Sequence, residues 1–265
     1  MVTAALNSRA RRDEIVRLAM TTGLATVEEL AGTFDVTAST IRRDLALLTS
    51  EGRLTRTLGG AIAPNAHPEA SLRQRTGEAF EAKRGIARWA AAQIRPGETV
   101  LLDAGSTVGA LAHELRSATA LTVATTGLTA LQELADVDAV HVECLGGTLR
   151  HLSQGFVGPL AEAALERMTF DRAFLGADGV TPDGGICEAD LQQTRLKELM
   201  ARHADQVYVL AHAGKLLRQP FHAWAPLSRK WTLVTDHQAD SAVIAAFAAN
   251  GVEVVIVDPD GHRIN

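Results

Sequence analysis

The sequence predicts a small N-terminal helical domain followed by a larger α/β domain with a mostly parallel sheet. Three observations support this division. Residues 1–61 contain three short helical patterns and one alternating segment, whereas residues 81–265 alternate apolar runs with helical patterns. Between them, residues 62–80 hold two prolines and little periodicity, as is typical of a linker.

Length and composition fit this interpretation and exclude several classes of protein. At 265 residues the chain can bury two cores, and 46% hydrophobic with 22% charged residues is ordinary for a globular protein. Cys144 and Cys187 lack CxxC spacing, so we expect both to be small buried residues, with no disulfide framework, metal or cofactor. The start lacks the apolar core of a signal peptide, and no apolar run reaches the ~18 residues of a membrane span. We therefore expect a cytoplasmic protein with no membrane partner.

The first domain is predicted to begin with two amphipathic helices. The first carries its apolar residues at helical spacing, at Ile15, Val16, Leu18 and Ala19. Thr26 followed by Glu29 fits a capping box, so a second helix is expected to begin near Val27. Its inward face would then carry Leu30, Ala31 and Phe34.

A third helix is predicted after the turn at Asp35 and Val36, with Thr37 or Ser39 as its cap. Its inward residues at helical spacing are Ile41, Leu45 and Leu48. This arrangement leaves Arg42 and Arg43 exposed near the start of the helix. A solvated helix N-terminus gains nothing from two cations, whereas a phosphate backbone and guanine edges bind them well.

The segment from Arg53 to Thr57 alternates and is closed by Gly59 and Gly60, which predicts a small β-ribbon with an arginine at its tip. Three helices and such a ribbon describe a winged helix-turn-helix that binds double-stranded DNA. A plain helical hairpin with a charged outer face is the alternative, but it does not account for the flanking segments. The predicted DNA-contacting residues are Thr37, Ser39, Thr40, Arg42, Arg43, Arg53 and Arg56.

The net charge of −5 is unevenly divided between the two domains. Residues 1–60 carry eight arginines and seven acidic residues, so their net charge is +1 and the remainder carries −6. A local basic face is what DNA binding requires. The acidity of the larger domain indicates a role other than contacting DNA.

The larger domain is predicted to contain seven strands with helices between most of them. The strands are residues 99–103, 121–124, 140–145, 172–175, 207–210, 231–234 and 252–257, and a helix from Glu81 to about Ile94 precedes them. In such parallel sheets, ligands bind at the carboxyl ends of the strands.

Small polar and cationic residues follow several of these strands. Asp103, Gly105, Ser106 and Thr107 follow the first strand and open a helix, which favours an anion. Each feature alone is also typical of an ordinary turn or a solvated side chain. Taken together, they predict a pocket for a phosphorylated sugar or polyol, formed by these four residues with Thr125, Thr126, Gly146, Gly147, Asp178, Gly179, Lys197 and Lys215.

Motifs in both domains resemble the DeoR family of bacterial transcription regulators. Residues 36–45 read V-T-A-S-T-I-R-R-D-L, against a family pattern of V-S-x-x-T-I-R-R-D-L, and residues 52–61 follow G-x-L-x-R-x-H-G-G-A with Leu58 at the histidine position. Residues 102–107, 122–126, 146–147, 178–179, 193–197, 212–215 and 234–236 are similar to motifs of the family's effector domain, which is related to ribose-5-phosphate isomerase. Departures from the pattern lie at Thr126, Gln193, His212 and Gly214.

This resemblance implies a repressor of a carbohydrate or polyol operon that is controlled by a phosphorylated metabolite. A sugar-phosphate isomerase or deaminase is the alternative, with Asp103, Asp178 or Glu188 as a base. A second domain that only dimerises the protein would leave the strand-end groups without a role. Because a single recognition helix reads only a short site, we expect a homo-oligomer, a dimer or a tetramer.

Overall fold

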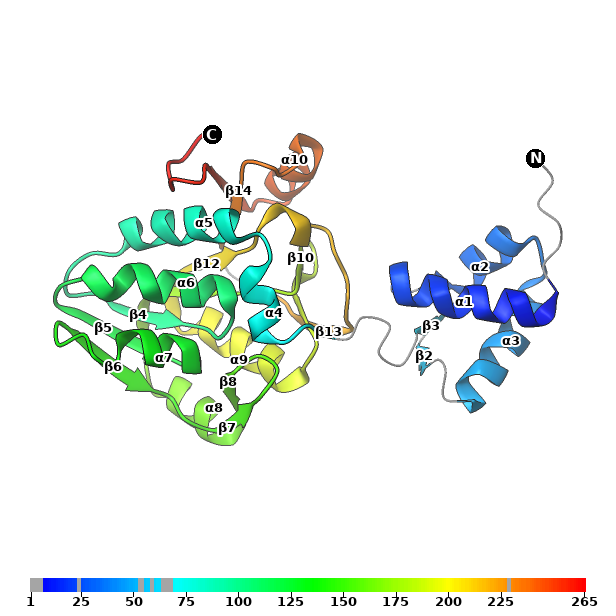
Figure 1. The fold of residues 1–265 in the computed structure, drawn as a ribbon, viewed down its shortest axis with the longest axis horizontal. Helices are drawn as coiled ribbons and strands as arrows, with labels where there is room; N and C mark the ends of the chain where they lie inside the picture. Colours follow the sequence, from blue (N-terminus) through cyan, green and yellow to red (C-terminus); the bar gives the residue numbers. More distant parts are fainter. Residues whose placement is uncertain (1–6, 23–24, 52–54, 58–59, 63–68, 228–229) are drawn as a thin grey trace. The chain divides into compact units, whose positions relative to one another are not determined.

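The computed structural model describes residues 7–22, 25–51, 55–57, 60–62, 69–227 and 230–265. The chain divides into two compact units, Met1–Glu69 and Ala70–Asn265 (Figure 1). Each unit has its own hydrophobic core, as the sequence predicts.

The first unit is a winged helix-turn-helix. Its helices are α1 (Ser8–Thr22), α2 (Val27–Phe34) and α3 (Ala38–Ser50), and its strands are β1 (Ala25–Thr26), β2 (Thr55–Thr57) and β3 (Gly60–Ile62). The strands form an antiparallel sheet in the order β1-β3-β2. The core includes Ile15, Leu30, Ile41, Leu45 and Leu48, so the predicted inward face of the third helix is confirmed.

The turn between α2 and α3 has a definite geometry. Asp35 takes a left-handed conformation with φ of 50°, which aspartate tolerates better than most residues. The amide of Val36 donates to the carbonyl of Ala31 at 3.1 Å, which closes the end of α2.

Part of the predicted linker belongs instead to the second unit. Residues 70–80 include a short helix, α4 (Leu72–Gly77), which begins with a reciprocal capping box between Ser71 and Gln74. Leu72 is buried against the larger domain, and its amide donates to the carbonyl of Leu152 at 2.8 Å. Six residues are too few to produce a visible helical period, so the sequence pattern resembled a linker.

The second unit contains a seven-stranded, fully parallel sheet in the order β15-β14-β12-β9-β4-β5-β6. All seven predicted strands are confirmed. Their bounds are β4 (Thr99–Leu102), β5 (Leu121–Thr125), β6 (Val140–Cys144), β9 (Phe170–Leu175), β12 (Ala204–Leu210), β14 (Thr232–Asp236) and β15 (Glu253–Val257).

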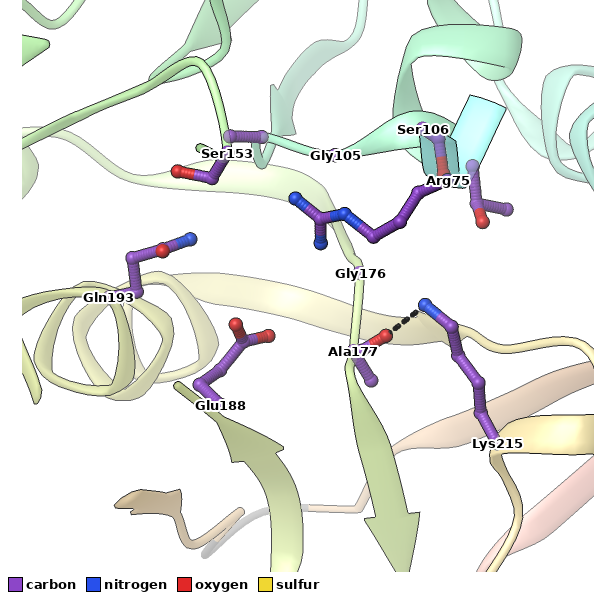
Figure 2. A pocket seen from close by; sticks show the side chains of 11 residues that line it. Arg75, Gly105, Ser106, Ser153, Gly176, Ala177, Glu188, Gln193 and Lys215 are labelled. Atoms are coloured by element: carbon purple, nitrogen blue, oxygen red, sulfur yellow. Dashed lines mark hydrogen bonds between the residues drawn. The ribbon is translucent and has the colours of Figure 1, made fainter. Parts of the chain in front are cut away.

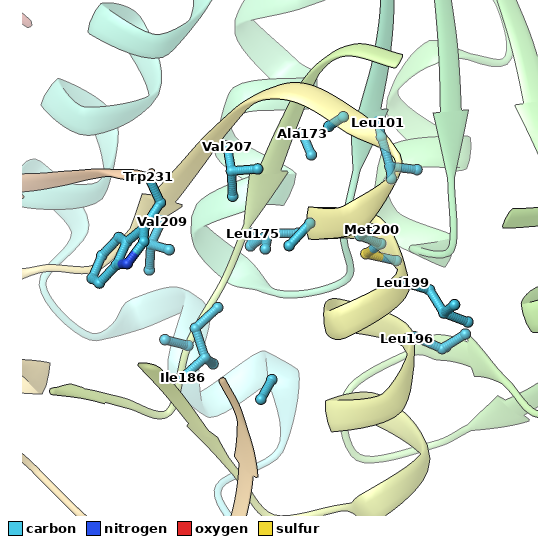
Figure 3. Close-up of a cluster of buried hydrophobic side chains, with 14 of the residues drawn as sticks. Leu101, Ala173, Leu175, Ile186, Leu196, Leu199, Met200, Val207, Val209 and Trp231 are labelled. Atoms are coloured by element: carbon cyan, nitrogen blue, oxygen red, sulfur yellow. The ribbon is translucent and has the colours of Figure 1, made fainter. Parts of the chain in front are cut away.

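Helices cover both faces of this sheet. One face packs against α5 (Phe80–Gln93), α6 (Ser106–Glu114) and α7 (Leu128–Leu134). The other face packs against α8 (Pro159–Leu165), α9 (Leu191–Arg202) and α10 (Ser241–Ala249), around the cluster shown in Figure 3. Residues buried on both faces explain why the strands read as continuous apolar runs.

The strand order places a ligand-binding crevice at one point of the sheet. From β4 the chain builds outward through β5 and β6, then returns to add β9 on the other side of β4 and continues through β12. This reversal is a topological switch point, where ligands bind in open α/β sheets. Short antiparallel strands surround it, namely β7 (Thr148–Arg150), β8 (Gly155–Val157), β10 (Gly179–Thr181), β11 (Gly185–Glu188) and β13 (Ala223–Ala225).

The two cysteines differ in their surroundings. Cys187 is buried as predicted, and its thiol donates to the carbonyl of Phe221 at 3.3 Å. Cys144 is exposed, contrary to the prediction, because it lies on the edge strand β6, whose side chains are largely exposed. Among the described helices, none is long and apolar enough to cross a membrane.

Candidate functional site

The start of α3 presents polar groups to solvent. Thr37 caps the helix, and its hydroxyl oxygen accepts from the amide of Thr40 at 3.3 Å. The same hydroxyl lies 2.9 Å from the hydroxyl of Ser39. Arg42 and Arg43 are exposed on the turn that follows. Hydroxyls, amides and guanidinium groups at one helix terminus are the groups that bind phosphates and base edges.

An ion pair fixes α3 against α1. The carboxylate of Asp44 is buried and lies 2.7 Å from Nε of Arg11 and 3.5 Å from Nη1 of Arg12. Asp44, which follows the two exposed arginines, therefore points inward, and arginines of α1 neutralise its charge. For this reason Asp44 does not reduce the positive charge of the exposed face. Of the predicted wing residues, Arg53 lies outside the described residues, and only the backbone of Arg56 is described, in β2.

A small pocket lies at the switch point of the second unit (Figure 2). One wall is the loop after β4 with the start of α6, and the opposite wall is Gly176 and Ala177, which follow β9. The first wall consists of Ala104, Gly105, Ser106 and Thr107. Other elements complete the lining, with Arg75, Ser153, Glu188, Gln193 and Lys215. The carboxyl ends of two neighbouring strands thus converge on one cavity, as the parallel sheet predicts.

The loop between β4 and α6 depends on glycine. Gly105 has φ of 133°, a conformation that side chains rarely adopt, and it directly precedes the first residue of α6. The first-turn amides of α6 and the hydroxyls of Ser106 and Thr107 therefore stand at a helix N-terminus beside the cavity. This combination favours an anion.

Beneath the pocket lies a buried triad of charged residues. The Lys197 ammonium contacts a carboxylate oxygen of Asp103, lies 3.0 Å from Oε1 of Glu188, and donates to the carbonyl of Gly176 at 2.9 Å. The same Asp103 oxygen accepts from the amide of Gly176 at 3.0 Å. Although burial opposes it, the two carboxylates raise the pKa of Lys197. The triad therefore joins the loop after β4 to the loop after β9.

Lys215, at the opposite end of the pocket, lies near Lys83, which lines an adjoining cavity, and near His212. Burial and the nearby Lys215 lower the pKa of Lys83 to about 8, and burial with Lys215 and Lys83 lowers the pKa of His212 to about 4. Burial also lowers the pKa of Lys215 itself. Lys83 and Lys215 donate to the carbonyls of Arg75 and Ala177, which are neutral acceptors. A bound anion would relieve this mutual repulsion.

The remaining wall offers hydrogen-bond acceptors. Burial, partly offset by Lys197, raises the pKa of Glu188 to about 8. Gln193 is 6% exposed, and its Oε1 is buried and has no hydrogen-bond partner among the described residues. Ser153 is also buried. Because a buried polar atom without a partner is costly, Gln193 marks a place where a ligand group can bind.

Two family models match the chain. Residues 11–67 match the DeoR-like helix-turn-helix domain, and residues 78–237 match the DeoR C terminal sensor domain. The chain belongs to the DeoR family. It is accordingly a DNA-binding transcription regulator with a sensor domain.

Several relatives of this DeoR-family chain are named as repressors. A putative aga operon transcriptional repressor from Escherichia coli O157:H7 is 29% identical over 252 residues, which cover 93% of each protein. A lactose phosphotransferase system repressor from Staphylococcus aureus strain N315 is 30% identical over 242 residues, which cover 90% of this chain and 96% of that protein. Among solved structures, ribose 5 phosphate isomerase A from Neisseria gonorrhoeae matches 51% of this chain and 52% of its own, at 17% identity and a TM-score of 0.38.

The small pocket of this DeoR-family chain brings together only some of the residues predicted from the sequence. Four of them line it, namely Gly105, Ser106, Thr107 and Lys215. Asp103 and Lys197 lie beneath the pocket in the triad, and Asp178 pairs with Arg75 at 3.1 Å behind its wall.

The other predicted residues maintain the backbone around the pocket. The Thr125 hydroxyl donates to the carbonyl of Leu102 at 2.8 Å, and the backbone of Thr126 bonds to Phe156. Gly146 and Gly147 form the turn before β7, and Gly179 lies where an added Cβ would stand 2.2 Å from the carbonyl of Arg218. None of these five predicted residues lines the small pocket in the described part of the chain, and the strand-end pattern alone does not reveal this.

Sequence reasoning missed Arg75, Ser153 and Lys83. Arg75 lies in the segment predicted as a linker, and Ser153 lies in the turn between β7 and β8. Lys83 is 3% exposed inside α5, where a lysine is usually solvated. Its position among apolar residues on the inward face of α5 was the one signal that could have identified it.

Proposed function

We propose that this regulator represses a carbohydrate or polyol operon in the cytoplasm and senses a phosphorylated sugar or polyol in the pocket at the switch point. The observation that carries this proposal is the junction of a glycine-opened helix N-terminus with Lys215 and Arg75 in one cavity. The name of the lactose phosphotransferase system repressor supports the carbohydrate class.

The phosphate is assigned to the cationic end. Amides of the first turn of α6 and the hydroxyls of Ser106 and Thr107 would donate to its oxygens, with Lys215 and Lys83 supplying charge. The lowered pKa values of both lysines support this, because an added anion stabilises their charged forms.

The hydroxyl groups of the effector are assigned to the acceptor wall. Glu188, Gln193 and Ser153 line the side of the pocket away from Lys215 (Figure 2). The pKa of Glu188 is raised, so its carboxyl group can be protonated. In that form it can also donate to a sugar oxygen.

Thermal unfolding with a panel of compounds tests the pocket. Ribose 5-phosphate, fructose 6-phosphate and glycerol 3-phosphate are compared with their unphosphorylated counterparts and with inorganic phosphate. A compound at a hundred times its Kd adds about 2.7 kcal/mol, or roughly 5–11 °C in Tm for a domain of this size. Lys215→Ala should lose most of the shift, whereas Lys230→Ala, at an exposed site, should keep it. If Lys215→Ala showed the same rise in Tm as the wild type, the phosphate of the compound would not bind at Lys215.

DNA contacts are assigned to the exposed start of α3 and to the wing, with Thr37, Ser39, Thr40, Arg42 and Arg43 on the helix and Arg53 and Arg56 in the wing. We expect Arg42→Ala or Arg43→Ala to cost on the order of 1–3 kcal/mol, about 5–150-fold in Kd, by fluorescence anisotropy. Arg195→Ala removes the same charge from an exposed site in the sensor unit and should have little effect. Unchanged affinity in both α3 variants would contradict the assignment.

The proposed regulator is a homo-oligomer that binds the effector without turnover. Two symmetric recognition helices read a longer site than one, so light scattering should show a dimer or a tetramer. Of the candidate bases, Asp103 and Asp178 are engaged by Lys197 and Arg75, and Glu188 is also held by Lys197. NMR should show no interconversion of ribose 5-phosphate or fructose 6-phosphate. Steady turnover that Glu188→Gln abolishes would establish an enzyme instead.

A further inference from the structure

The side chain of Arg75 occupies the middle of the pocket. Figure 2 shows it extending across the cavity, between Gly105 and Gly176. The cavity that remains has a volume of about 10 Å³, which is about the minimum for a single water. A sugar phosphate therefore fits only if a wall of the pocket moves.

The wall that carries Arg75 is α4. A second cavity of about 790 Å³ borders the pocket, and Ser106 lines both. The helix contributes Arg75 to the small pocket and Leu72, Arg73 and Thr76 to the larger cavity. A displacement of α4 would thus enlarge the pocket toward space that is already present.

Several of the contacts that hold α4 in place come from residues in or next to the walls of the pocket. Nη1 of Arg75 lies 3.1 Å from Oδ1 of Asp178, the residue after Ala177 of the lining. Nη2 of Arg75 and the amide of Leu72 both donate to the carbonyl of Leu152, at 3.4 and 2.8 Å. Leu152 directly precedes Ser153, which also lines the pocket. A ligand that displaces Asp178 or Leu152 would therefore change the contacts that hold α4.

We propose that Arg75 is a latch that links effector binding to the DNA-binding unit. Without effector, the guanidinium fills the pocket and its pairing with Asp178 holds α4 down. A phosphorylated effector replaces Asp178 as the anionic partner of the guanidinium. The Arg75 side chain then leaves the centre of the pocket, and α4 moves with it. Because Ala70 begins the second unit and α4 begins at Leu72, this movement reaches the chain that enters the DNA-binding unit. The latch rests on the proposed function, since it needs an effector phosphate in this pocket.

The test measures three quantities on the full-length protein with ribose 5-phosphate, fructose 6-phosphate, glycerol 3-phosphate and inorganic phosphate as probes. These are the change in Tm, the hydrogen exchange of residues 70–78, and the ratio of DNA Kd values with and without the probe. The DNA is a duplex that the wild-type protein selects from a random-sequence library. The variants are Arg75→Ala, Asp178→Asn as a milder change outside the lining, and Arg73→Ala as a control on an exposed site of the same helix.

In the wild type, at least one sugar phosphate should raise Tm, alter exchange over residues 70–78 and change the DNA Kd by about 5–150-fold. Asp178→Asn should still show the rise in Tm, but its Kd ratio should fall to within twofold of one. Arg75→Ala should show the same fall in Kd ratio together with a smaller rise in Tm, because it also removes a cation that would contact the effector phosphate. Arg73→Ala should behave like the wild type.

The outcomes separate the latch from the pocket. If a probe raises Tm but Arg75→Ala and Asp178→Asn keep the wild-type Kd ratio, the latch is refuted and the effector pocket stands. Unchanged exchange over residues 70–78 in the ligand-bound wild type also refutes it. If no probe raises the Tm of the wild type, the proposed pocket fails and the latch fails with it.

Discussion

Replacement of Lys197 by Met should strongly destabilise the sensor unit while leaving its pocket lining unchanged. Lys197 is 1% exposed, and its carboxylate partners Asp103 and Glu188 are each 4% exposed. The substitution roughly keeps the side-chain volume, but it removes the cation from two buried carboxylates and the donor from the carbonyl of Gly176. Removing one partner of a buried ion pair costs about 3–5 kcal/mol. For a domain of this size, that corresponds to a fall in Tm of roughly 6–20 °C.

The loss should depend on pH with a definite sign. Without the ammonium, the folded-state pKa of Glu188, which burial already raises, rises further above its unfolded value of about 4.3. Between that unfolded value and the folded one, the folded state binds more protons than the unfolded state, so its stability falls as pH rises. Because Glu188 of the wild type loses its proton only near pH 8, the deficit of Lys197→Met should be larger at pH 9 than at pH 7.

Thermal and urea unfolding followed by circular dichroism at both pH values would measure this effect. Lys230→Met is the matched control, because Lys230 is exposed and surface changes usually stay within about 0.5 kcal/mol. Adding Asp103→Asn to Lys197→Met should restore part of the lost stability, since one uncompensated carboxylate is gone. A deficit below about 1 kcal/mol that does not vary with pH would refute the structural role of the triad.

Three further predictions concern stability. The raised pKa of Glu188, about 8, makes the wild type lose stability as pH rises from 5 to 8, so over that range the free energy of unfolding of Glu188→Gln should rise by roughly 2–4 kcal/mol relative to that of the wild type. Urea unfolding at several pH values measures this, and parallel pH profiles of the two proteins would contradict it. Gly147→Ala should lower Tm far more than Gly146→Ala, since an added Cβ at Gly147 would lie 2.5 Å from the carbonyl of Val157 and meets nothing within 4 Å at Gly146; equal losses would contradict it. Thr37→Ala should destabilise α3 by about 1 kcal/mol through loss of its cap, measured by thermal unfolding of the DNA-binding unit, and an unchanged Tm would exclude that role.

The sequence by itself determined the elements and their classes. Helical spacing of Ile41, Leu45 and Leu48 identified the recognition helix, and apolar runs identified all seven parallel strands. The glycine-opened loop at Gly105 was recognisable because a strand, a glycine and a helix start are adjacent in the chain. Each of these signals is local, since hydrophobic periodicity and capping act over a few residues.

Only the tertiary structure decided which strand-end groups share a cavity. The Arg75 guanidinium meets Asp178 across 103 residues of sequence, and Lys197 meets Asp103 across 94. The pairing of β9 with β4 brings together the loops that carry Asp103 and Asp178. Arg75 on α4 and Lys197 on α9 then contact these loops from other parts of the chain. Lys197 was predicted, like Lys215, as a phosphate ligand. In the structure it is buried between the carboxylates of Asp103 and Glu188. Hydrophobic periodicity indicates which side of a helix or strand is buried, but it does not indicate which other element covers that side. Contacts between residues about a hundred positions apart are therefore decided by the order of the strands in the sheet.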